Sequence, residues 1–276
     1  MQTERTDRVN WSTLKAIGVS PKHYLHLLAN PRPQTDALLL GSLTHCMVFE
    51  PDQINARYAK EPRFHHGMND DTARAKGYDG GKQAALEWAL DHTGQQHVSA
   101  EMYDAAYHMA QSVLKDPVAA PFVTEGWNEY TINWRDALTG IDCRGRVDHV
   151  NGTLSDLKTT RSLVSFERDI ARFGYHAQLA WYLDGLHAAN AQTTGQPVLV
   201  AVESQPPYDV LVLRFDDDDI AVGRRVYRQY LDRLAECRAS GEWPGVGGGA
   251  VRRVVLPPWA GPMEDELVID GETVAL

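Results

Sequence analysis

The chain has 276 residues, of which 43% are hydrophobic, and its 37 acidic against 27 basic side chains give a formal net charge of −10. This length is long for one domain and short for two, and the hydrophobic fraction suffices for a sizeable core. The negative charge argues against a protein that coats nucleic acid, because such proteins are basic. It does not exclude a nuclease, since a metal site is itself acidic and a local basic groove can coexist with an acidic exterior.

The three cysteines, Cys46, Cys143 and Cys237, are far apart and form no CxxC pair. This spacing argues against a zinc ribbon or an iron–sulfur cluster, and the sparse, odd count indicates a reducing compartment. The N-terminus lacks an apolar signal segment, and no run of about 18 apolar residues occurs. We therefore expect a soluble, cytoplasmic protein.

The first 120 residues predict a mainly helical part. Helices are expected over residues 10–17, 23–29, 37–49, 82–92 and 99–115. Their expected starts are capping residues or prolines, namely Asn10 or Ser12, Ser20 with Pro21, and Thr35 or Asp36. Residues 52–81 are rich in glycine and polar residues and predict a long irregular loop, either a mobile flap near a substrate or a disordered surface loop.

Residues 121–240 predict an α/β core. Strands are expected over 128–135, 141–150, 153–159, 198–203 and 210–215, and helices over 163–172, 175–190 and 216–239. The acidic run Asp216 to Asp219 is better explained as the first turn of a helix than as a metal cluster. Residues 241–276 are a Gly/Pro-rich tail that we expect to pack loosely or to form an oligomer contact.

The expected architecture is thus one domain over residues 1–276, an α/β sandwich with a central mixed sheet flanked by helices and an α-helical N-terminal extension.

Acidic and basic residues gather on the predicted strands of the core. Asp156 and Lys158 are two apart on one strand and therefore share a face. Asp148 ends the preceding strand. A two-residue turn at Asn151 and Gly152 would place Asp148 and Asp156 on opposite faces.

A three-residue loop over 151–153, or a bulge nearby, instead pairs Val150 with Leu154 and Asp148 with Asp156. It also pairs Val147 with Leu157 on the core side. This apolar pairing favours the second register.

Two facing carboxylates repel each other unless a cation lies between them. Mg²⁺ suits hard oxygen ligands and needs few of them from the protein, so Asp148 and Asp156 would suffice, with the carbonyl of Leu157 as a further ligand. Such an ion would activate water and polarise a scissile phosphate. Lys158 would then orient the nucleophile or offset developing charge.

Three further residues are placed where they could help to bind the water, the phosphate or the metal ion. Gln178 and Tyr182 are four apart on a predicted helix, hence on one face, and could hold the water or a phosphate. Glu129, on the first core strand, could hold a ligand or a second ion through water. The plain alternative is a surface hairpin with an Asp–Lys salt bridge beside an ordinary amphipathic helix.

The ordered set of motifs over residues 10–235 resembles the PD-(D/E)XK nuclease superfamily, and within it the RecE-like exonuclease VIII branch of phage and prophage recombination modules. The segments that carry the resemblance are NWSTLK (10–15), GSLTH (41–45), CRGRVD (143–148), DLKTT (156–160) and YHAQ (175–178) with Tyr182.

This resemblance implies roles for individual residues. His45 would match the histidine that approaches the metal, Asp148 and Asp156 the metal ligands, and Lys158 the catalytic lysine. Gln178 and Tyr182 would match the Gln-x-x-x-Tyr helix of the family. Asp156 stands where many relatives have glutamate.

The resemblance also implies an activity: Mg²⁺-dependent, 5′ to 3′ degradation of one strand of linear duplex DNA, with Mn²⁺ as a substitute metal. The product would be single strand for an annealing protein, in a bacterial or phage-infected cell. Related enzymes form rings, so a homo-oligomer is expected. Candidate DNA-binding residues are Arg63, Lys76, Lys82, Arg144, Arg146 and Arg161.

Two other functions remain open at this stage. One is a non-catalytic DNA-end-binding accessory protein of recombination on the same fold. The other is an endonuclease or a single-strand-specific nuclease.

Overall fold

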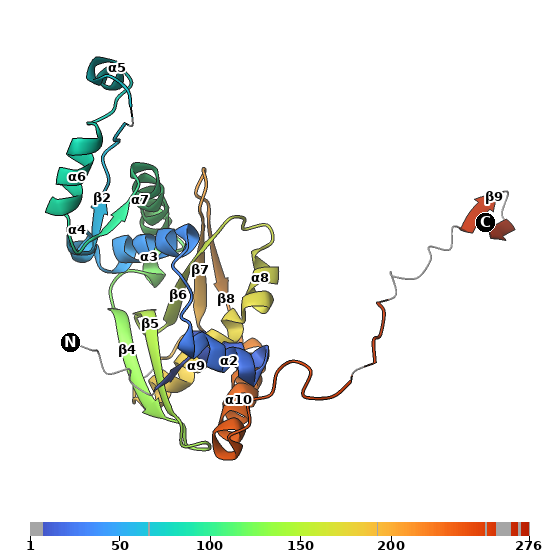
Figure 1. Ribbon diagram of the computed structural model, residues 1–276. Coiled ribbons are helices and arrows are strands. Elements are labelled where there is room, and N and C mark those ends of the chain that lie inside the picture. The colour runs from blue at the N-terminus through green and yellow to red at the C-terminus, as the bar shows by residue number, and fades with distance from the viewer. Residues whose placement is uncertain are drawn as a thin grey trace.

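The computed structural model describes residues 8–65, 67–191, 193–251 and 253–257, and the backbone of 266–269 and 272–275. Figure 1 shows a body in which helices cover a central sheet, and an arm, residues 58–98, that projects from it. No helix among the described residues is both long and apolar enough to cross a membrane.

The α-helices are α1 (Trp11–Leu14), α2 (Pro21–Ala29), α3 (Asp36–Phe49), α4 (Ile54–Arg57), α5 (Asp70–Ala75), α6 (Lys82–Asp91), α7 (Ala100–Lys115), α8 (Phe166–Phe173), α9 (Tyr175–Ala188) and α10 (Asp217–Ser240). Short 3₁₀ helices are η1 (Lys15–Gly18), η2 (Pro51–Gln53) and η3 (Ala120–Phe122). The strands are β1 (Val9–Asn10), β2 (Tyr58–Lys60), β3 (Gln96–Val98), β4 (Trp127–Arg135), β5 (Asp142–Val150), β6 (Leu154–Thr160), β7 (Val198–Glu203), β8 (Val210–Arg214), β9 (Glu266–Ile269) and β10 (Glu272–Ala275).

Side-chain caps begin the helices where the sequence predicts them. Thr35 Oγ1 accepts a hydrogen bond from the backbone N–H of Leu38 at 3.3 Å and so begins α3. Asp216 Oδ1 accepts one from Asp219 at 2.9 Å and begins α10. The interpretation of the acidic run as a helix start is therefore confirmed.

The central sheet is six-stranded and mixed. Along one edge β5 pairs antiparallel with β4. Along its other edge, β5 pairs parallel with β1 through Cys143 and Arg144, and antiparallel with β6 through His149 and Val150. β6 then runs parallel to β7, which is antiparallel to β8. Between the β1 and β6 contacts, residues 145–148 of β5 have no strand partner on this edge within the described chain, and the candidate site forms at this opening.

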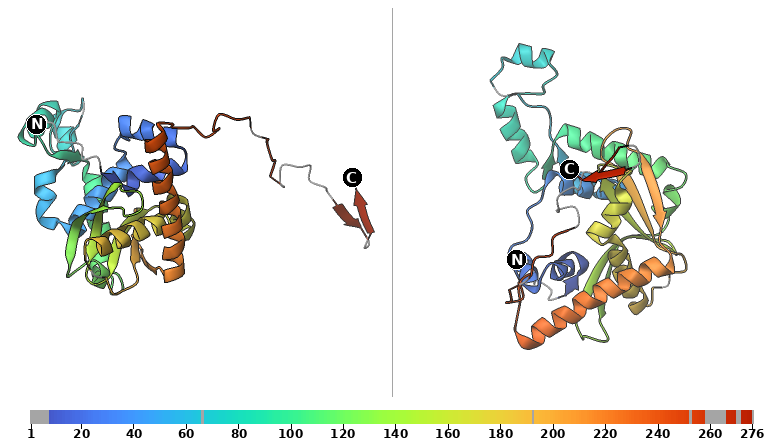
Figure 2. Two further views of the ribbon diagram at one scale, coloured as in Figure 1. Left: turned by 90° about the horizontal axis from the view of Figure 1, so that it is seen from below. Right: turned by 90° about the vertical axis from the view of Figure 1, so that its right-hand side faces the viewer.

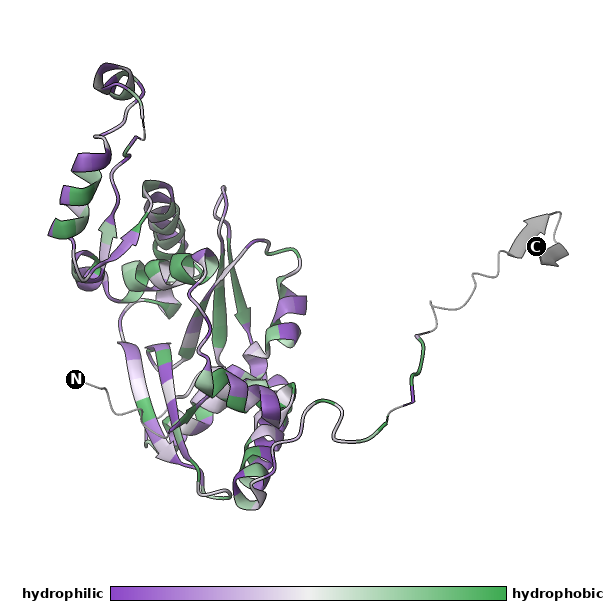
Figure 3. Cartoon of the chain, viewed as in Figure 1, coloured by the Kyte–Doolittle hydropathy of each residue, from purple (hydrophilic) through white to green (hydrophobic). Residues whose placement is uncertain are grey.

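The two faces of the sheet carry separate hydrophobic clusters. Leu199 and Ala201 of β7 pack with α9 and α10, whereas Val200 and Val202 pack with α3 and α7. Because both faces are covered, β7 is hydrophobic along nearly its whole length (Figure 3). The long helix α10 also contacts η1 and α2 and lies beside these N-terminal helices (Figure 2).

The loop over 151–153 has the predicted three-residue register. Val150 pairs with Leu154 and His149 pairs with Ser155, as that loop requires. The ladder between β5 and β6 consists of these two pairs, so the predicted pairing of Asp148 with Asp156 does not form in it.

A second consequence drawn from this register, the pairing of Val147 with Leu157 on the core side, is also wrong. Val147 packs in the cluster on the α9 and α10 side, whereas Leu157 packs in the cluster on the α3 and α7 side. The two residues do not share a core, since β5 and β6 separate after His149 and Ser155.

Residues 52–81 also differ from the predicted irregular loop. They contain η2, α4, β2 and α5, and Phe64 forms a bridge to Gly80. β2 pairs in parallel with β3, so the arm is joined at its base by a two-stranded sheet. After α10, the ring of Trp243 stacks on Tyr24 with centroids 6.0 Å apart, and the described residues to 257 run away from the body (Figure 1).

Candidate active site

Helix α3 brings His45 to the opening in the sheet. Gly41, one turn earlier, faces β6, and a Cβ there would meet Thr159 Oγ1 at 3.4 Å, an ordinary van der Waals contact. His45 Nε2 lies 2.8 Å from the carbonyl oxygen of Leu157, and Nδ1 lies 3.5 Å from Asp148 Oδ2. The histidine therefore contacts both strands that carry predicted site residues.

The C-terminal end of α3 is held against the sheet. The amide nitrogen of Asn128 donates to the carbonyl of Phe49 at 2.9 Å, and His149 Nδ1 donates to Asn128 Oδ1 at 2.6 Å. The rings of Phe49 and His149 are stacked with centroids 6.1 Å apart. These contacts fix the helix one turn beyond His45.

Glu129 lies between the ladder pairs Asn128–His149 and Tyr130–Val147 of β4 and β5, which places it next to Asp148. Its φ of +49° is a left-handed backbone conformation. Such a conformation costs on the order of 1–3 kcal/mol for a residue other than glycine, and it persists only where the surroundings hold it. Glu129, Asp148 and His45 each offer one ligand atom, and these atoms lie within 4.8 Å of one another. An oxygen and nitrogen donor set of this kind fits a divalent cation.

Asp156 and Lys158 form an ion pair beside this cluster, between Oδ2 and Nζ. Asp156 is only 1% exposed, and its other oxygen, Oδ1, has no hydrogen-bond partner among the described residues. Lys158 Nζ also lies 5.0 Å from the ring centroid of Tyr175. Asp156 is therefore a buried carboxylate with unused acceptor capacity next to the proposed ligands.

Burial and mutual repulsion raise the pKa values of two carboxylates of the site. Burial, and then Asp156, raise the pKa of Asp148. Burial, and then Asp148, raise the pKa of Glu129. A cation between these groups would relieve both effects, because it favours the ionised form of each carboxylate.

The pKa values of the two nitrogen bases of the site, His45 and Lys158, shift in opposite directions. Burial, and then Lys158, lower the pKa of His45, which favours the neutral ring. Burial also acts to lower the pKa of Lys158, but Asp156 and Asp148 outweigh it and the pKa is raised. The site thus combines a neutral imidazole, able to bind a metal, with a charged ammonium group.

His45, Glu129, Asp148 and Lys158 line a central cavity of about 740 Å³. Arg146 lies at its wall, where Nε contacts Glu129 Oε2 at 2.5 Å and Nη2 contacts Glu50 Oε2 at 3.3 Å. Glu50 in turn forms two hydrogen bonds to the guanidinium group of Arg57, at 2.6 and 2.7 Å. Arg146, predicted as a DNA-binding residue, here bridges two acidic side chains.

Gln178 and Tyr182 lie on one face of α9, and Gln178 Nε2 donates to the Tyr182 hydroxyl at 3.0 Å. They line a smaller cavity of about 290 Å³ together with Arg144 and Arg146. Arg146 lines both cavities, so the two meet at its side chain. Burial, and then Asp156 and Asp148, raise the pKa of Tyr182 and keep its phenol protonated.

The other predicted DNA-binding residues lie outside the candidate metal site, and one of them, Arg63, lines a separate cavity at the arm. Arg161 is exposed just beyond the end of β6, whereas Lys76 and Lys82 are exposed on the arm. None of the three lines the central cavity or the smaller one.

Comparison with protein families identifies this arrangement. The model of the family described as "PDDEXK-like domain of unknown function (DUF3799)" matches residues 10–251. The chain belongs to this PDDEXK-like family.

One solved structure, with a TM-score above 0.5, supports the fold of the PDDEXK-like domain. The crystal structure of a "putative exonuclease" from Eubacterium rectale aligns with a TM-score of 0.61 at 11% identity, over 93% of this chain and 96% of that chain. A second structure, of the protein SSO0001, aligns with a TM-score of 0.27 at 15% identity, over 68% and 84% of the two chains. No curated protein matches the sequence. The predicted superfamily, PD-(D/E)XK, and the predicted α/β fold with a central mixed sheet are confirmed.

Some polar residues of the central cavity had no role assigned from the sequence, although Tyr175 belongs to the YHAQ segment that carries the resemblance. Glu50, Arg57 and Tyr175 all line the central cavity. Glu50 is the first residue after the helix that carries His45, and Tyr175 begins the helix that carries Gln178. Their closeness in sequence to predicted site residues was the available signal for both, whereas nothing in the sequence near Arg57 indicated the site.

Proposed function

We propose that this protein is a magnesium-dependent exodeoxyribonuclease that degrades linear duplex DNA from an end, 5′ to 3′, in the manner of RecE-like enzymes. The single strand produced would serve recombination through an annealing protein, and the active form would be a ring-shaped homo-oligomer. The observation that carries the proposal is the convergence of His45, Glu129 and Asp148 beside the Asp156–Lys158 pair, on a PDDEXK-like fold.

His45 Nδ1, Glu129 and Asp148 would hold the ion, with Asp156 as a further ligand. If His45 donates its Nε2 proton to the carbonyl of Leu157, the lone pair of Nδ1 is left facing Asp148. Metal-binding histidines commonly use their second nitrogen in this way. The Leu157 carbonyl then orients His45, and its second lone pair remains available to the ion. When bound, Mg²⁺, or Mn²⁺ in its place, supplies Lewis-acid activation of water and of the scissile phosphate.

Lys158 supplies the positive charge that the reacting phosphate needs. Its ammonium group stays protonated beside Asp156 and opens into the central cavity. It can therefore offset the charge that develops on the phosphate oxygens in the transition state. Gln178 and Tyr182 would hold the phosphate or the attacking water with their polar groups.

Basic side chains around the site would bind the DNA backbone. Arg144 and Arg146 lie next to Gln178 and Tyr182 and would contact phosphates near the scissile bond. The more distant contacts would come from Arg161, Lys76 and Lys82. Such contacts make binding weaken as the salt concentration rises.

The test is digestion of end-labelled linear duplex DNA with and without Mg²⁺, beside a closed circular control. Mg²⁺-dependent loss of the linear substrate alone, starting from the 5′ label, is the expected result. Loss of both substrates would make the protein an endonuclease, and loss of the 3′ label first would reverse the polarity. Binding without cleavage in Mg²⁺ or Mn²⁺ would leave the accessory-protein function instead.

A further inference from the structure

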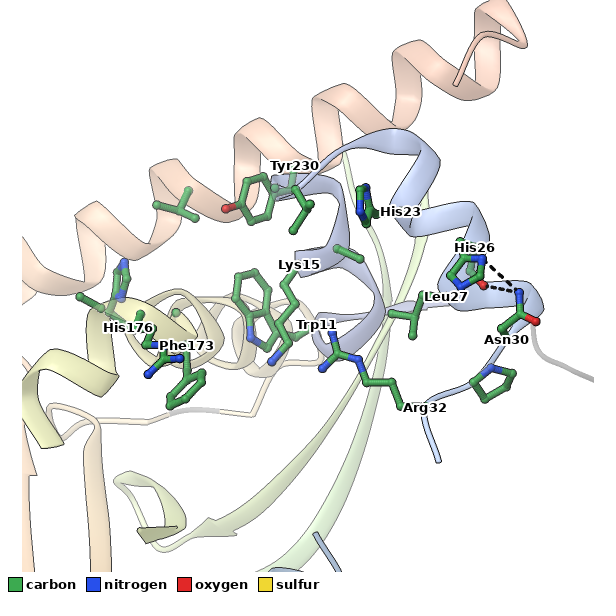
Figure 4. A pocket seen from close by; sticks show the side chains of 18 of the residues that line it. Trp11, Lys15, His23, His26, Leu27, Asn30, Arg32, Phe173, His176 and Tyr230 are labelled. Atoms are coloured by element: carbon green, nitrogen blue, oxygen red, sulfur yellow. Dashed lines mark hydrogen bonds between the residues drawn. The ribbon is translucent and has the colours of Figure 1, made fainter. Parts of the chain in front are cut away.

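A second large cavity, the N-terminal cavity, has a volume of about 1000 Å³ (Figure 4). Its walls come from α1, η1, α2 and the loop after α2 on one side, and from the end of α8, the start of α9 and the middle of α10 on the other. The residues that matter for its chemistry are Trp11, Lys15, Arg32, Arg172, Phe173 and Tyr230. Its volume is at the upper end of the roughly 300–1,000 Å³ typical of ligand sites.

The N-terminal cavity is basic in an acidic protein. No aspartate or glutamate is among the residues that line it, although the chain carries 37 acidic residues against 27 basic ones. Lys15, Arg32 and Arg172 line it, and no carboxylate forms an ion pair with any of them in the described part of the chain. Figure 4 shows Lys15 and Arg32 approaching each other beside Trp11.

The closeness of these cations contributes to a lowered pKa of Lys15. Burial, then Arg32, and then Lys158 of the central cavity lower the pKa of Lys15. Like charges held together without a counter-ion are unfavourable, and an anionic ligand would relieve this repulsion.

Aromatic rings form the other part of the cavity wall. Trp11 stacks on Tyr230 with centroids 6.2 Å apart, and the indole nitrogen of Trp11 is buried without a hydrogen-bond partner among the described residues. Gly174, at a φ of +70°, leaves room for the Trp11 ring, since a Cβ there would lie 3.1 Å from it. Phe173 is 41% exposed, and the guanidinium carbon of Arg172 lies 5.2 Å from its ring centroid. Phe173 thus offers an accessible ring face next to a cation.

The N-terminal cavity and the central cavity are neighbours. Phe173 lines both of them, and Trp11 lines both the N-terminal cavity and the smaller cavity beside Gln178. A chain-like ligand can therefore extend from the metal-binding residues across Phe173 to Lys15 and Arg32.

We propose that the N-terminal cavity binds an unpaired stretch of the DNA strand next to the scissile phosphate, which deepens, and rests on, the proposed nuclease function. Lys15, Arg32 and Arg172 contact its phosphates, and a base stacks on Phe173. Aromatic stacking combined with a basic groove is how proteins hold single strands. A paired base inside a duplex has no free face to offer the ring, so the cavity selects a single strand.

The test is the binding of a fluorescein-labelled single-stranded oligonucleotide to the full-length protein in EDTA, followed by fluorescence anisotropy at several salt concentrations. The double variant Arg32→Ala/Arg172→Ala should bind roughly tenfold more weakly, and its salt slope should fall by about 1.4, since each phosphate contact on single strands contributes about 0.7. Phe173→Leu should also bind roughly tenfold more weakly with an unchanged slope, because it removes stacking and no charge.

The matched control is Arg214→Ala, an exposed arginine at the end of β8 that lines none of the three cavities and has no ion pair within the described chain. It should bind as the wild type does. Arg32, Arg172 and Phe173 are exposed, so their variants should fold, and thermal melting verifies this.

Wild-type affinity and salt slope in the double variant would overturn the proposal. So would displacement of the labelled oligonucleotide by a polyglutamate peptide at lower concentrations than by unlabelled oligonucleotide, which would make the occupant an acidic protein segment. Cleavage of duplex by the wild type, assayed in parallel with Mg²⁺, separates this inference from the proposed function. If the wild type cleaves and the double variant still binds single strands normally, only the cavity assignment fails. If the wild type does not cleave and the double variant loses single-strand binding, the cavity assignment stands and the nuclease proposal fails.

Discussion

His45 Nε2 lies 2.8 Å from the carbonyl oxygen of Leu157, the residue between Asp156 and Lys158. This contact joins a helix outside the sheet to the centre of the Asp-x-Lys segment. It places one ring nitrogen on the backbone and directs the other toward Asp148. His45 of α3 and the carboxylates of Glu129 and Asp148, on β4 and β5, thereby converge as candidate metal ligands.

Replacing His45 by alanine should weaken Mg²⁺ or Mn²⁺ binding by at least about tenfold, because it removes a proposed ligand. Isothermal titration calorimetry without DNA measures this directly. His187→Ala, at an exposed histidine in the last turn of α9, is the control and should bind metal as the wild type does. An unchanged affinity in His45→Ala would remove His45 from the metal site.

Replacing Lys158 by alanine should reduce cleavage by roughly 10²–10³-fold, the usual effect of losing one charge-stabilising group in an active site. DNA binding should remain within about threefold of wild type, since most backbone contacts are elsewhere. Single-turnover cleavage and anisotropy on the same preparation measure both properties. Lys115→Ala, at an exposed lysine that ends α7, is the control. Normal cleavage by Lys158→Ala would contradict the catalytic assignment.

The metal-free protein should lose stability as the pH rises, and Asp148 should be a main cause. Burial and Asp156 raise the pKa of Asp148 to about 8. A carboxyl with a raised pKa in the folded state contributes fully to stability below its unfolded value of about 3.9, and this contribution is lost as the pH rises toward its folded value.

The measurement is the melting temperature against pH in EDTA for the wild type and Asp148→Asn. The melting temperature of the variant should rise relative to that of the wild type by several degrees between about pH 4 and 8. Mg²⁺ should reduce this difference because it favours the ionised carboxylate. Parallel curves for the two proteins in EDTA would show that Asp148 ionises freely.

Gly223→Ala should destabilise the fold by about 1–3 kcal/mol, the typical cost of overpacking. Gly223 lies where α10 crosses α9, and a Cβ there would lie 2.3 Å from the backbone oxygen of His176, which a rotamer change cannot relieve. Urea unfolding gives the difference. Gly247→Ala is the control, since a Cβ at Gly247 meets nothing within 4 Å. Equal midpoints for Gly223→Ala and the wild type would mean that the two helices can separate at little cost.

The sequence revealed features that depend on neighbouring residues. Thr35 begins α3 through its own side chain, and the loop over 151–153 follows from the need to pair Val150 with Leu154. The Asp-x-Lys spacing places both side chains on one face of β6, because that relation is a property of any strand. These signals sufficed to indicate the fold and most of the residues around the site.

Features that depend on contacts between distant segments could not be predicted in full from the sequence. The sequence predicted a role for Glu129 only through water, whereas its direct position among the candidate metal ligands depends on the register of β4 against β5 and on a left-handed backbone at Glu129 itself. β1 has only two residues and exists because β5 leaves an edge open to it. The short elements within 52–81 likewise depend on pairing between β2 and β3, which no local pattern reports.

The pairing of β1 with β5 links the N-terminal helices to the strand that carries Asp148. Asn10, which caps α1, is paired with Arg144, on the same strand that carries Asp148. Trp11 follows directly in α1, and Lys15 begins η1. If the N-terminal helices bind a DNA strand, tension on that strand would act on the backbone next to the candidate metal ligands. Binding and cleavage of the strand would then both depend on the paired strands β1 and β5. The protein could hold a DNA strand under tension without moving the scissile phosphate away from the candidate metal ligands.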